Sequence, residues 1–417
     1  MARIVMKFGG TSVADLDRIA HVAQIVAAAA RSGERPAVVV SAMAGETNKL
    51  VDYVRRIGPP AQGLGGGQDE YDAVVASGEQ VSAGLTALAL RAQGLRARSW
   101  LGWQAGVRTT GVHGQARIQD IAVDPLAQAV DDGEIAVLAG FQGAGPDGRI
   151  TTLGRGGSDT SAVALAAALE ADRCDIFTDV DGVYTTDPRI ERRARRIDRI
   201  SYEEMLEMAS LGAKVLQTRS VELAMAKSVR LRVLSSFLAV GAPNPGTLVC
   251  EEDDIMEKRI VSGVAYSRDD AKITLLGLAD HPGVAARVFQ VLADEHVNVD
   301  MIVQSRARSA EAANMEFTVG GADLDRAVAI LERRQTELSF ESLTADADVA
   351  KISEIGLWQK SHLVVSQTMF TALADRGINI QVISTSEIKI SVLIDAEYTE
   401  LAVRALHAAY GLDRSRD

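Results

Sequence analysis

Two glycine-rich stretches of this chain carry residue types that bind anions. The first is Lys7-Phe8-Gly9-Gly10-Thr11-Ser12, which follows an apolar run at 2–6 and precedes an alanine-rich segment with helical spacing at 16–30. Paired glycines let the backbone approach a ligand, N–H groups at a helix start point toward it, and a lysine adds a positive charge. The stretch predicts a phosphate site between a buried strand and a helix. An ordinary turn with a surface lysine is the alternative.

The start of the first helix carries a capping signal. Ser12 and Asp15 stand in capping-box spacing, which predicts that the helix begins there. The Walker A pattern G-x-x-x-x-G-K-[ST] occurs nowhere in the chain, so a phosphate site here is of another type.

The second stretch is T-T-L-G-R-G-G-S-D-T-S at 151–161, which enters an apolar helix predicted at 162–169. Arg155 suits a carboxylate or a phosphate, and glycines at a helix start form a nest of N–H groups. Asp159 in the first helical turn is either a functional carboxylate or a simple cap. Two anion-binding loops in one domain indicate that two anions are brought together, as in phosphoryl transfer.

Polar residues also follow other predicted strands. A strand at 37–41 leads into a loop at 42–49, where Ser41 and Thr47 are either hydroxyl donors to a substrate or turn residues. Glu79 follows Ser77-Gly78 at the start of a helix that runs to residue 92. An acidic residue there is usually a helix cap, and the alternative is a carboxylate that binds a substrate amine.

A loop at 180–189, V-D-G-V-Y-T-T-D-P-R, follows a strand at 175–179. It suits base stacking and phosphate binding, and two consecutive turns under a packed tyrosine would explain it equally. Lys214 lies in a segment, 212–216, predicted to open a helix. A cation is misplaced at a helix N-terminus, so we expect it to meet an anion.

The remaining elements alternate between strand and helix. We predict strands at 95–100, 135–141, 231–234 and 246–249, a helix at 125–130 and a surface loop at 58–67. Alternation of this kind predicts a mostly parallel sheet with helices on both faces.

Composition limits the function. The chain has 417 residues, 47% of them hydrophobic, and a formal net charge of −12. This charge argues against nucleic-acid binding but permits a small anionic substrate. Cys174 and Cys250 lie far apart, which predicts no disulfide and a reducing cytoplasm. No signal peptide or membrane-spanning run is evident.

An internal repeat occupies the last third. After the charged residues 251–254, the segment L-A-D-E-H-V-N-V-D-M-I at 292–302 matches L-A-D-R-G-I-N-I-Q-V-I at 373–383. Each copy is preceded by a strand, at 272–276 and 351–353. The repeat predicts two ferredoxin-like βαββαβ units.

Taken together, the motifs resemble those of one family over nearly the whole chain. K-F-G-G-T-S-V, S-A-M-x-x-x-T, S-G-E, T-L-G-R-G-G-S-D-T-S-A, D-V-D-G-V-Y-T-T-D-P-R and G-A-K-V-L are similar to the aspartokinases of the amino-acid kinase superfamily. The repeats resemble their paired ACT domains. The resemblance implies an α/β fold: a three-layer kinase domain at 1–250, a linker at 251–262, and ACT domains at 263–345 and 346–417. The C-terminal strand is a candidate to complete the first ACT domain.

The implied reaction is transfer of a phosphoryl group from ATP, with Mg²⁺, to the side-chain carboxylate of L-aspartate. The products are 4-phospho-L-aspartate and ADP, in the first step toward lysine, threonine and methionine. A carboxylate nucleophile is already ionised at neutral pH, so the chemistry needs positive charge and positioning rather than a base. Mg²⁺ would be bound mainly by ATP phosphates, and we assign it no protein ligand.

The resemblance also implies residue roles. Catalytic roles fall to Lys7, Arg155 and Asp159. The nucleotide would be bound by Lys7, Phe8, Gly9, Gly10, Ser41, Ser158, Thr178, Asp179, Tyr184, Thr185, Thr186, Asp187, Pro188, Arg189 and Lys214. Aspartate would be bound by Ser41, Thr47, Glu79, Arg155, Gly156, Gly157 and Ser158.

Effector binding is implied for the two repeats, with lysine and/or threonine as effectors. The matching positions are Asp280, Asn298, Val299, Asp300 and Gln304, then Val365, Ser366, Asn379, Ile380, Ser386 and Glu387. The first repeat has His281-Pro282-Gly283, but the second has His362-Leu363-Val364, which predicts an altered loop. Our hypothesis is that only the first-repeat site binds tightly.

Assembly and alternative functions complete the predictions. We expect a homodimer or higher oligomer, because paired ACT domains pack across subunits. Met256 is either an internal start for a separate regulatory subunit or an ordinary linker methionine. The alternatives to aspartate phosphorylation are a catalytically inactive amino-acid-binding protein and a kinase of another amino acid.

Overall fold

The protein divides into two compact units. Unit 1 comprises Met1–Val183 and Arg196–Glu257, and unit 2 comprises Tyr184–Arg195 and Lys258–Asp417. The computed structural model describes residues 1–58, 67–212, 215–255, 260–307, 312–356 and 362–414. Most of the loop predicted at 58–67, together with Lys214 and Met256, lies outside the described residues.

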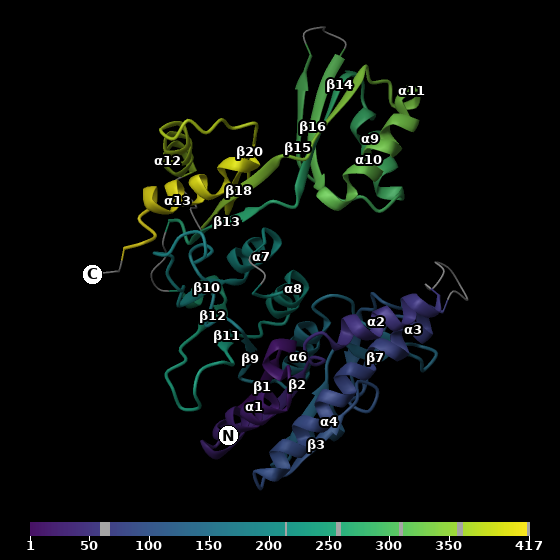
Figure 1. Ribbon diagram of the computed structural model, residues 1–417, viewed down its shortest axis with the longest axis vertical. Coiled ribbons are helices and arrows are strands. Elements are labelled where there is room, and N and C mark those ends of the chain that lie inside the picture. The colour runs from purple at the N-terminus through teal and green to yellow at the C-terminus, as the bar shows by residue number, and fades with distance from the viewer. Residues whose placement is uncertain (59–66, 213–214, 256–259, 308–311, 357–361, 415–417) are drawn as a thin grey trace. The chain divides into compact units, whose positions relative to one another are not determined.

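Unit 1 is built on an eight-stranded sheet in the order β10-β12-β11-β9-β1-β2-β6-β3 (Figure 1). Six strands are parallel; β12 runs antiparallel to β11, and β10 is parallel to β12. The strands are β1 Arg3–Phe8, β2 Arg35–Val40, β3 Ala97–Trp100, β6 Ile135–Ala139, β9 Arg173–Thr178, β10 Arg199–Ser201, β11 Leu231–Ser235 and β12 Thr247–Cys250. The mostly parallel sheet confirms the predicted fold class.

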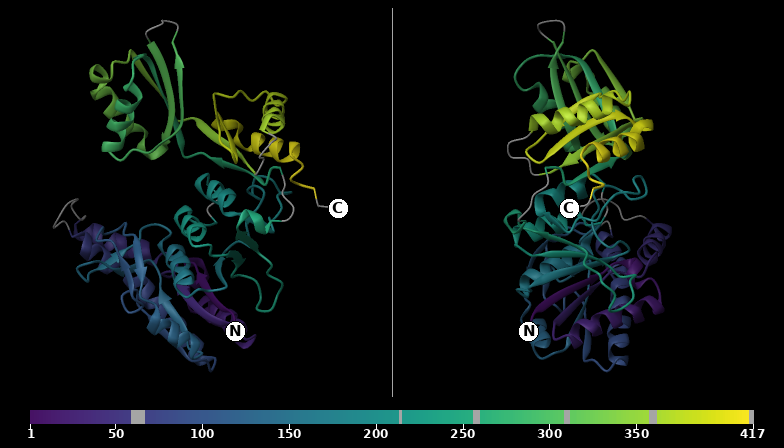
Figure 2. Two further views of the ribbon diagram at one scale, coloured as in Figure 1. Left: turned by 180° about the vertical axis from the view of Figure 1, so that it is seen from behind. Right: turned by 90° about the vertical axis from the view of Figure 1, so that its left-hand side faces the viewer.

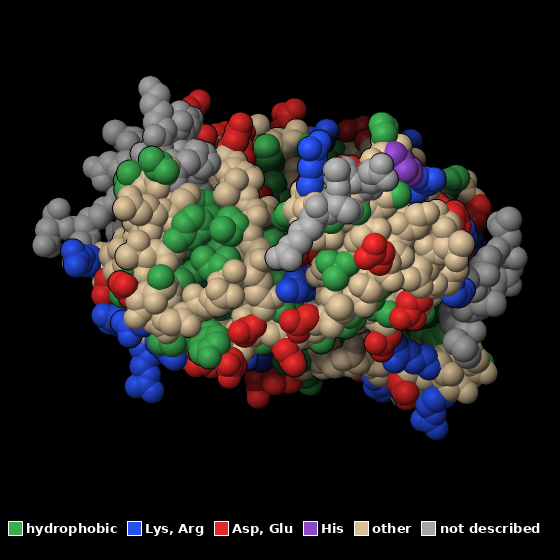
Figure 3. All heavy atoms as spheres, turned by 90° about the horizontal axis from the view of Figure 1, so that it is seen from above, with side chains coloured by type: hydrophobic (Ala, Val, Ile, Leu, Met, Phe, Trp, Pro, Cys, Tyr) green, Lys and Arg blue, Asp and Glu red, His purple; other side chains and the backbone are tan. Residues whose placement is uncertain are grey.

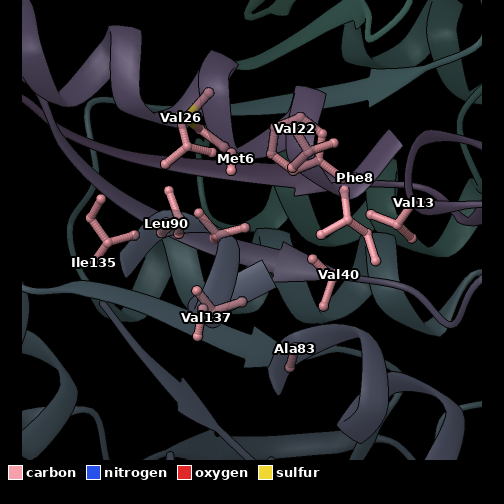
Figure 4. Packing of buried hydrophobic residues seen from close by; sticks show 14 of the residues in the cluster. Met6, Phe8, Val13, Val22, Val26, Val40, Ala83, Leu90, Ile135 and Val137 are labelled. Atoms are coloured by element: carbon pink, nitrogen blue, oxygen red, sulfur yellow. The ribbon is translucent and has the colours of Figure 1, made fainter. Parts of the chain in front are cut away.

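Helices cover both faces of this sheet. Helices α1 (Leu16–Arg31) and α4 (Ser77–Ala92) cover one face, where Met6, Phe8 and Val40 pack among their apolar side chains (Figure 4). Helix α6 (Gly157–Ala168) packs on β1, β2 and β9. Lys7 reaches it, because successive side chains of a strand point to opposite faces. The three layers thus put Lys7 on the α6 side of the sheet.

Shorter elements complete unit 1. A second sheet has the order β5-β4-β7-β8. The remaining elements are the 3₁₀ helices η1 (Gly10–Val13) and η2 (Glu252–Asp254), β4 Val107–Thr109, β5 Ile118–Ile121, β7 Gln142–Ala144, β8 Ile150–Thr152, α2 Glu46–Ile57, α3 Gln68–Val75, α5 Asp124–Asp131, α7 Tyr202–Ser210 and α8 Thr218–Ala226.

Four local predictions for unit 1 are wrong. Asp15 alone caps α1, accepting a hydrogen bond from the Arg18 N–H, while Ser12 lies in η1 and bonds Ser236 instead. Helix α2 begins at Glu46, inside the predicted loop, and α6 begins at Gly157 rather than at residue 162. The helix predicted to open at 212–216 begins only at Thr218. In each case, tertiary contacts or an early glycine set the helix start.

Gln68–Ala92 is long and apolar enough to span a membrane by length and composition, contrary to the sequence prediction. Half of its most apolar window is buried inside the protein, and α4 packs against α1 and β3. It is therefore a core helix of unit 1. Cys174 and Cys250 are both buried and free, as predicted.

Unit 2 contains two antiparallel four-stranded sheets with related strand orders. The first repeat forms β15-β16-β14-β17 and the second forms β19-β20-β18-β13. The first contains β14 Asp270–Ala279, α9 Val284–Asp294, β15 Val299–Arg306, β16 Ala312–Gly320, η3 Gly321–Asp323, α10 Leu324–Arg333, α11 Gln335–Leu338 and β17 Ser342–Asp346. The second contains β13 Gly263–Ser267, β18 Val349–Ile355, α12 His362–Ala374, β19 Val382–Thr385, β20 Lys389–Asp395, η4 Ala396–Tyr398 and α13 Thr399–Ala409.

Strand β13 belongs to a different repeat from the one predicted. We placed residues 263–267 in the first repeat and considered a C-terminal strand as its completion. In the structure β13 pairs with β18 of the second repeat, in the position that β17 occupies in the first. The second repeat ends in helix α13 and not in a strand. Its fourth strand is β13, which lies before the first repeat in the chain.

Each repeat has its own core, with helices packed on one sheet face (Figure 2). A smaller cluster, which includes Met301 and Val349, joins the two sheets. Beside it, the Lys351 ammonium lies 3.0 Å from Asp270 and 2.9 Å from Asp300. These contacts tie the two repeats of one chain together.

Candidate active site

The two anion-binding stretches meet in unit 1. Lys7 is the penultimate residue of β1 and is 8% exposed. Its Nζ lies 2.6 Å from Oδ1 of Asp159, which is in the first turn of α6 and is also buried. A buried cation and anion so close together at the end of a central strand form an ion pair that a ligand phosphate can compete for.

The glycine pair lies where three strand ends converge. Gly9 donates its N–H to the Phe177 carbonyl at the end of β9, and Ser41 after β2 donates to the Phe8 carbonyl. A Cβ on Gly10 would lie 3.0 Å from the Ala42 carbonyl oxygen, so a larger residue would be crowded there. Because β2 and β9 flank β1 on opposite sides, this is the switch point at which open α/β sheets bind ligands.

Phe8 takes part only through its backbone. Its ring is fully buried and stacks on Phe177 with centroids 4.7 Å apart, on the face covered by α1. Thr178, the last residue of β9, donates its hydroxyl proton to the Asp179 carboxylate. Both therefore lie beside Gly9 at the same sheet edge.

The second stretch is a tight turn into α6. Gly156 has a φ of +73°, and a Cβ there would lie 2.2 Å from the Gln217 side chain. A Cβ on Gly157 would meet Leu153 and Phe141 at 2.8 Å. Arg155, which directly precedes these crowded positions, is exposed and has no ion pair among the described residues. Its guanidinium is thus available to a ligand.

Sequence reasoning missed the residues that support this turn. Arg219 donates from its two terminal nitrogens to the carbonyls of Leu153 (2.7 Å) and Ala116 (2.8 Å). Fully buried Asp72 accepts hydrogen bonds from the backbone and hydroxyl of Thr152 and from Gly114, and pairs with His113. Their only sequence signal is a charged residue within an apolar helix, which does not identify its distant partners.

The Glu79 carboxylate is buried inside unit 1. It is 3% exposed, and its Oε1 accepts a hydrogen bond from the Ala42 N–H at 3.0 Å. Oε2 is buried without a partner among the described residues. Burial raises the pKa of Glu79 to about 7. A buried oxygen with no donor favours the ligand-binding interpretation over a helix cap. Thr47, by contrast, lies in the first turn of α2 and is half-buried.

Part of the predicted nucleotide set belongs to unit 2. These residues are Tyr184, Thr185, Thr186, Asp187, Pro188 and Arg189. Arg189 forms a bidentate ion pair with Asp187 and lowers the pKa of that carboxyl. The Thr185 side chain is buried, whereas Arg189 is exposed.

The predicted effector residues are spread over both repeats of unit 2. Asp300 of β15 is half-exposed and accepts a hydrogen bond from Lys351. The Val365 side chain is buried in the second-repeat core, which leaves its backbone for contacts. Gly283 caps α9 with a φ of +95°, whereas Val364 lies inside α12. The second repeat thus has valine in place of this glycine, and it has a helix where the first repeat has a turn. The other predicted positions are Asp280 before α9, Asn298, Val299 and Gln304 at or on β15, Ser366 in α12, Asn379 and Ile380 before β19, and Ser386 and Glu387 between β19 and β20.

A cavity on the α1 face of the sheet is separate from this site. Its lining includes Met6, Asp175 and Arg232. Arg232 and Arg173 are already paired with Asp175, so the polar groups are mutually satisfied. Among the described residues, no group of three or more His, Cys, Asp or Glu side chains is arranged to hold a metal ion.

Comparison with known families defines the class. The amino acid kinase family model matches residues 2–235, and an ACT domain model matches 273–335 and 352–410. Together with the mostly parallel sheet of unit 1, these matches describe an amino acid kinase domain followed by two ACT domains.

Full-length relatives narrow this class. The chain is 48% identical over 414 residues to "Aspartate kinase Ask_LysC" of Stutzerimonas stutzeri, covering 99% of this chain and 98% of that protein. It is 46% identical over 415 residues to an aspartokinase of Helicobacter pylori J99, covering 99% and 100%. The chain therefore belongs to the aspartate kinases.

Solved structures agree. Escherichia coli aspartokinase III in complex with aspartate and ADP (R-state) has a TM-score of 0.78 and 29% identity, covering 97% of this chain and 99% of that one. The same enzyme in complex with lysine and aspartate (T-state) has a TM-score of 0.74 and 31% identity, covering 97% and 98%.

Proposed function

We propose that this aspartate kinase transfers the γ-phosphoryl group of ATP to the side-chain carboxylate of L-aspartate, at the site built around Lys7 and Asp159. The observation that carries the proposal is their 2.6 Å ion pair, which joins two glycine-rich anion-binding stretches at the switch point. It gives 4-phospho-L-aspartate and ADP, in the cytoplasm, as the first step of lysine, threonine and methionine synthesis.

The chemical difficulty is electrostatic. The ATP phosphate and the aspartate carboxylate, both anions, must approach each other, and negative charge develops on the oxygens of the transferred phosphoryl group. Lys7 and the N–H groups of Gly9 and Gly10 would hold the phosphates, and exposed Arg155 would hold the aspartate carboxylate beside them. Asp159 keeps Lys7 oriented until the nucleotide enters. No general base is required, since the acceptor carboxylate is ionised.

Aspartate recognition would rest on Glu79. Its buried and unpartnered Oε2 is suited to the substrate ammonium group, whose positive charge would also stabilise ionised Glu79. Ser41, Thr47 and the backbone of 156–158 would supply further polar contacts. An amino acid would contact Glu79 through its ammonium group and Arg155 through a carboxylate. A simple dicarboxylate has no group for Glu79, so the site would select an amino acid.

Magnesium would enter with ATP. Mg²⁺ prefers phosphate and carboxylate oxygens, and the Asp159 carboxylate lies beside Lys7, the proposed phosphate-binding residue, so the donor chemistry fits. When bound, the ion would offset charge on the β- and γ-phosphates.

Regulation would come from unit 2. We propose that lysine and/or threonine bind at the predicted repeat positions; the T-state structure of the related Escherichia coli aspartokinase III is a complex with lysine and aspartate. The turn at His281-Pro282-Gly283 would form the tighter site, because Gly283 has a positive φ, whereas Val364 at the matching position of the second repeat lies inside α12. Titration calorimetry should then give one tight effector site per chain; two equivalent tight sites would contradict this.

The assembly remains a proposal as well. We expect at least a homodimer through the ACT domains, with Met256 as a candidate internal start for a regulatory subunit. On the face shown in Figure 3, acidic and basic side chains are interspersed, which suits protein contacts better than nucleic acid.

The test is ADP release from Mg-ATP with L-aspartate, alone and with lysine, threonine or both. Lys7→Ala should lower kcat by about 100-fold or more, because a charge-stabilising donor is lost. Its circular dichroism spectrum should be unchanged. Exposed Lys227→Ala is the matched control and should keep full activity. Full activity in Lys7→Ala, or release with glutamate but not with aspartate, would refute the proposal.

A further inference from the structure

The loop that carries much of the predicted nucleotide set is fixed to the last helix of the regulatory repeats. Residues 184–195 belong to unit 2, although unit 1 precedes and follows them in the chain. The loop closes on itself, because Thr185 donates its N–H to the Arg195 carbonyl and its Oγ1 accepts from the Arg195 N–H at 3.0 Å. The conformation of Thr185 therefore sets the shape of the loop.

Thr185 is in turn held by two elements of the second repeat. Its carbonyl accepts a hydrogen bond from the Val264 N–H at 2.8 Å, beside the start of β13. Its Oγ1 lies 2.9 Å from Nε2 of His407 on α13. Thr185 is 3% exposed and His407 is fully buried, so water does not substitute for either partner.

The hydrogen-bond network fixes the role of the imidazole. Thr185 Oγ1 accepts from the Arg195 N–H, and among the described residues Nε2 of His407 is the one acceptor in reach of its hydroxyl proton, so we assign the hydroxyl as the donor in this hydrogen bond. His407 is then neutral and carries its proton on Nδ1, which has no partner among the described residues. Burial lowers the pKa of His407 and keeps it neutral despite nearby Glu191 and Asp413. The imidazole thus serves as a buried acceptor for one threonine hydroxyl.

The rest of the loop is attached to the same repeat. The Tyr266 hydroxyl of β13 donates to Asp187 Oδ2 at 3.2 Å. Ile190 packs on the second-repeat core, and Arg193 pairs with Asp413 at 2.9 Å beyond α13. The hydrogen bonds and the ion pair named here join the 184–195 loop to β13, α13 and the chain after α13.

We propose that His407 is a positioning residue for ATP, acting from the regulatory unit through Thr185. The inference rests on the proposed nucleotide role of the 184–195 loop. His407 does not touch the nucleotide; it keeps Thr185, and so the backbone on either side of Asp187 and Arg189, in one conformation. It also gives the second repeat a direct physical connection to the nucleotide loop.

The test uses the full-length enzyme and separates the two Michaelis constants. His407→Leu leaves the buried Thr185 hydroxyl without an acceptor, and should raise KM for ATP about tenfold while KM for aspartate is unchanged. His407→Gln places an amide oxygen where Nε2 lies and should restore a near-normal KM for ATP. Thr185→Val should match His407→Leu, and the double variant should be no worse than either single variant.

Controls distinguish positioning from simple destabilisation. Val403→Ala removes core volume from the same helix without touching Thr185, and should lower thermal stability without raising KM for ATP. If His407→Leu behaves like Val403→Ala, or if the Thr185 and His407 effects are additive, the inference is refuted.

A further variant tests the underlying proposal separately. Asp187→Asn alters a residue of the predicted nucleotide set that does not contact His407 and should raise KM for ATP if the loop binds nucleotide. If Asp187→Asn weakens ATP binding but His407→Leu does not, only the positioning inference fails. If neither changes ADP binding by calorimetry, the nucleotide role of the loop fails and the inference with it.

Discussion

A buried carboxyl in the second repeat should make its stability depend on pH. Glu354 of β18 is fully buried between Val264 and Ile390 of the neighbouring strands. Neither carboxyl oxygen has a hydrogen-bond partner among the described residues. The nearby Tyr410 hydroxyl already donates its proton to the Val365 carbonyl at 2.7 Å, so it has none for Glu354. Ionisation of Glu354 is therefore costly in the folded state.

The magnitude follows from proton linkage. Burial raises the pKa of Glu354 from 4.5 to about 8. Between these values the folded state holds a proton that the unfolded chain releases, so stability is greatest below the lower value and falls as the pH rises toward the higher one. At about 1.4 kcal/mol per pH unit, the second repeat should lose about 3 kcal/mol between about pH 5.5 and about pH 8.5.

The perturbation is Glu354→Gln, which keeps the shape of the side chain and removes its ionisation. Hydrogen exchange of β18 and β20 amides in the full chain measures the free energy of opening of this sheet. Relative to the wild type, the variant should gain about 3 kcal/mol of stability between about pH 5.5 and about pH 8.5. Exposed Glu332→Gln on α10 is the control and should follow the wild-type curve. Parallel pH profiles for the wild type and Glu354→Gln would refute the reasoning.

Two further predictions concern buried charges elsewhere. Because burial raises the pKa of Glu79 to about 7, its carboxylate is protonated below that pH, and KM for aspartate should rise as the pH falls through it. Glu79→Gln should have a high KM for aspartate that is flat with pH and an unchanged affinity for ADP; an unaltered pH profile would exclude the ammonium contact. Lys351→Met leaves the partly buried Asp270 carboxylate beside an apolar group and should destabilise unit 2 by about 2–4 kcal/mol in thermal unfolding. Adding Asp270→Asn should recover most of this loss, and no recovery would show that Lys351 acts by packing alone.

Features coded by neighbouring residues were predictable. The strand, glycine pair and helix around Lys7 follow from local patterns, as do the alternation that defines the parallel sheet and the internal repeat that defines two βαββαβ units. The helix starts at Gly157 and Glu46 were missed, because a positive-φ glycine at the preceding position fixes each one. The capping role of Ser12 was wrong because a distant partner, Ser236, takes its hydroxyl.

Pairings between distant residues were not predictable. Lys7 and Asp159 are far apart in sequence, and only the adjacency of β1 and α6 makes them an ion pair. The support that Asp72 and Arg219 give to the second stretch depends equally on the fold. A single sequence carries no signal for such contacts, since their residue types are common and their spacing is arbitrary.

The sequence by itself determined the class of chemistry, because glycine, lysine and arginine at strand ends suit only a few ligands wherever the chain places them. Only the tertiary structure decided that β13 pairs with the second repeat, that residues 184–195 belong to unit 2, and that Glu354 and His407 are buried. The physical reason is that burial and pairing are properties of surroundings: the same carboxyl or imidazole is an exposed charge or a neutral buried group according to which distant strands and helices enclose it.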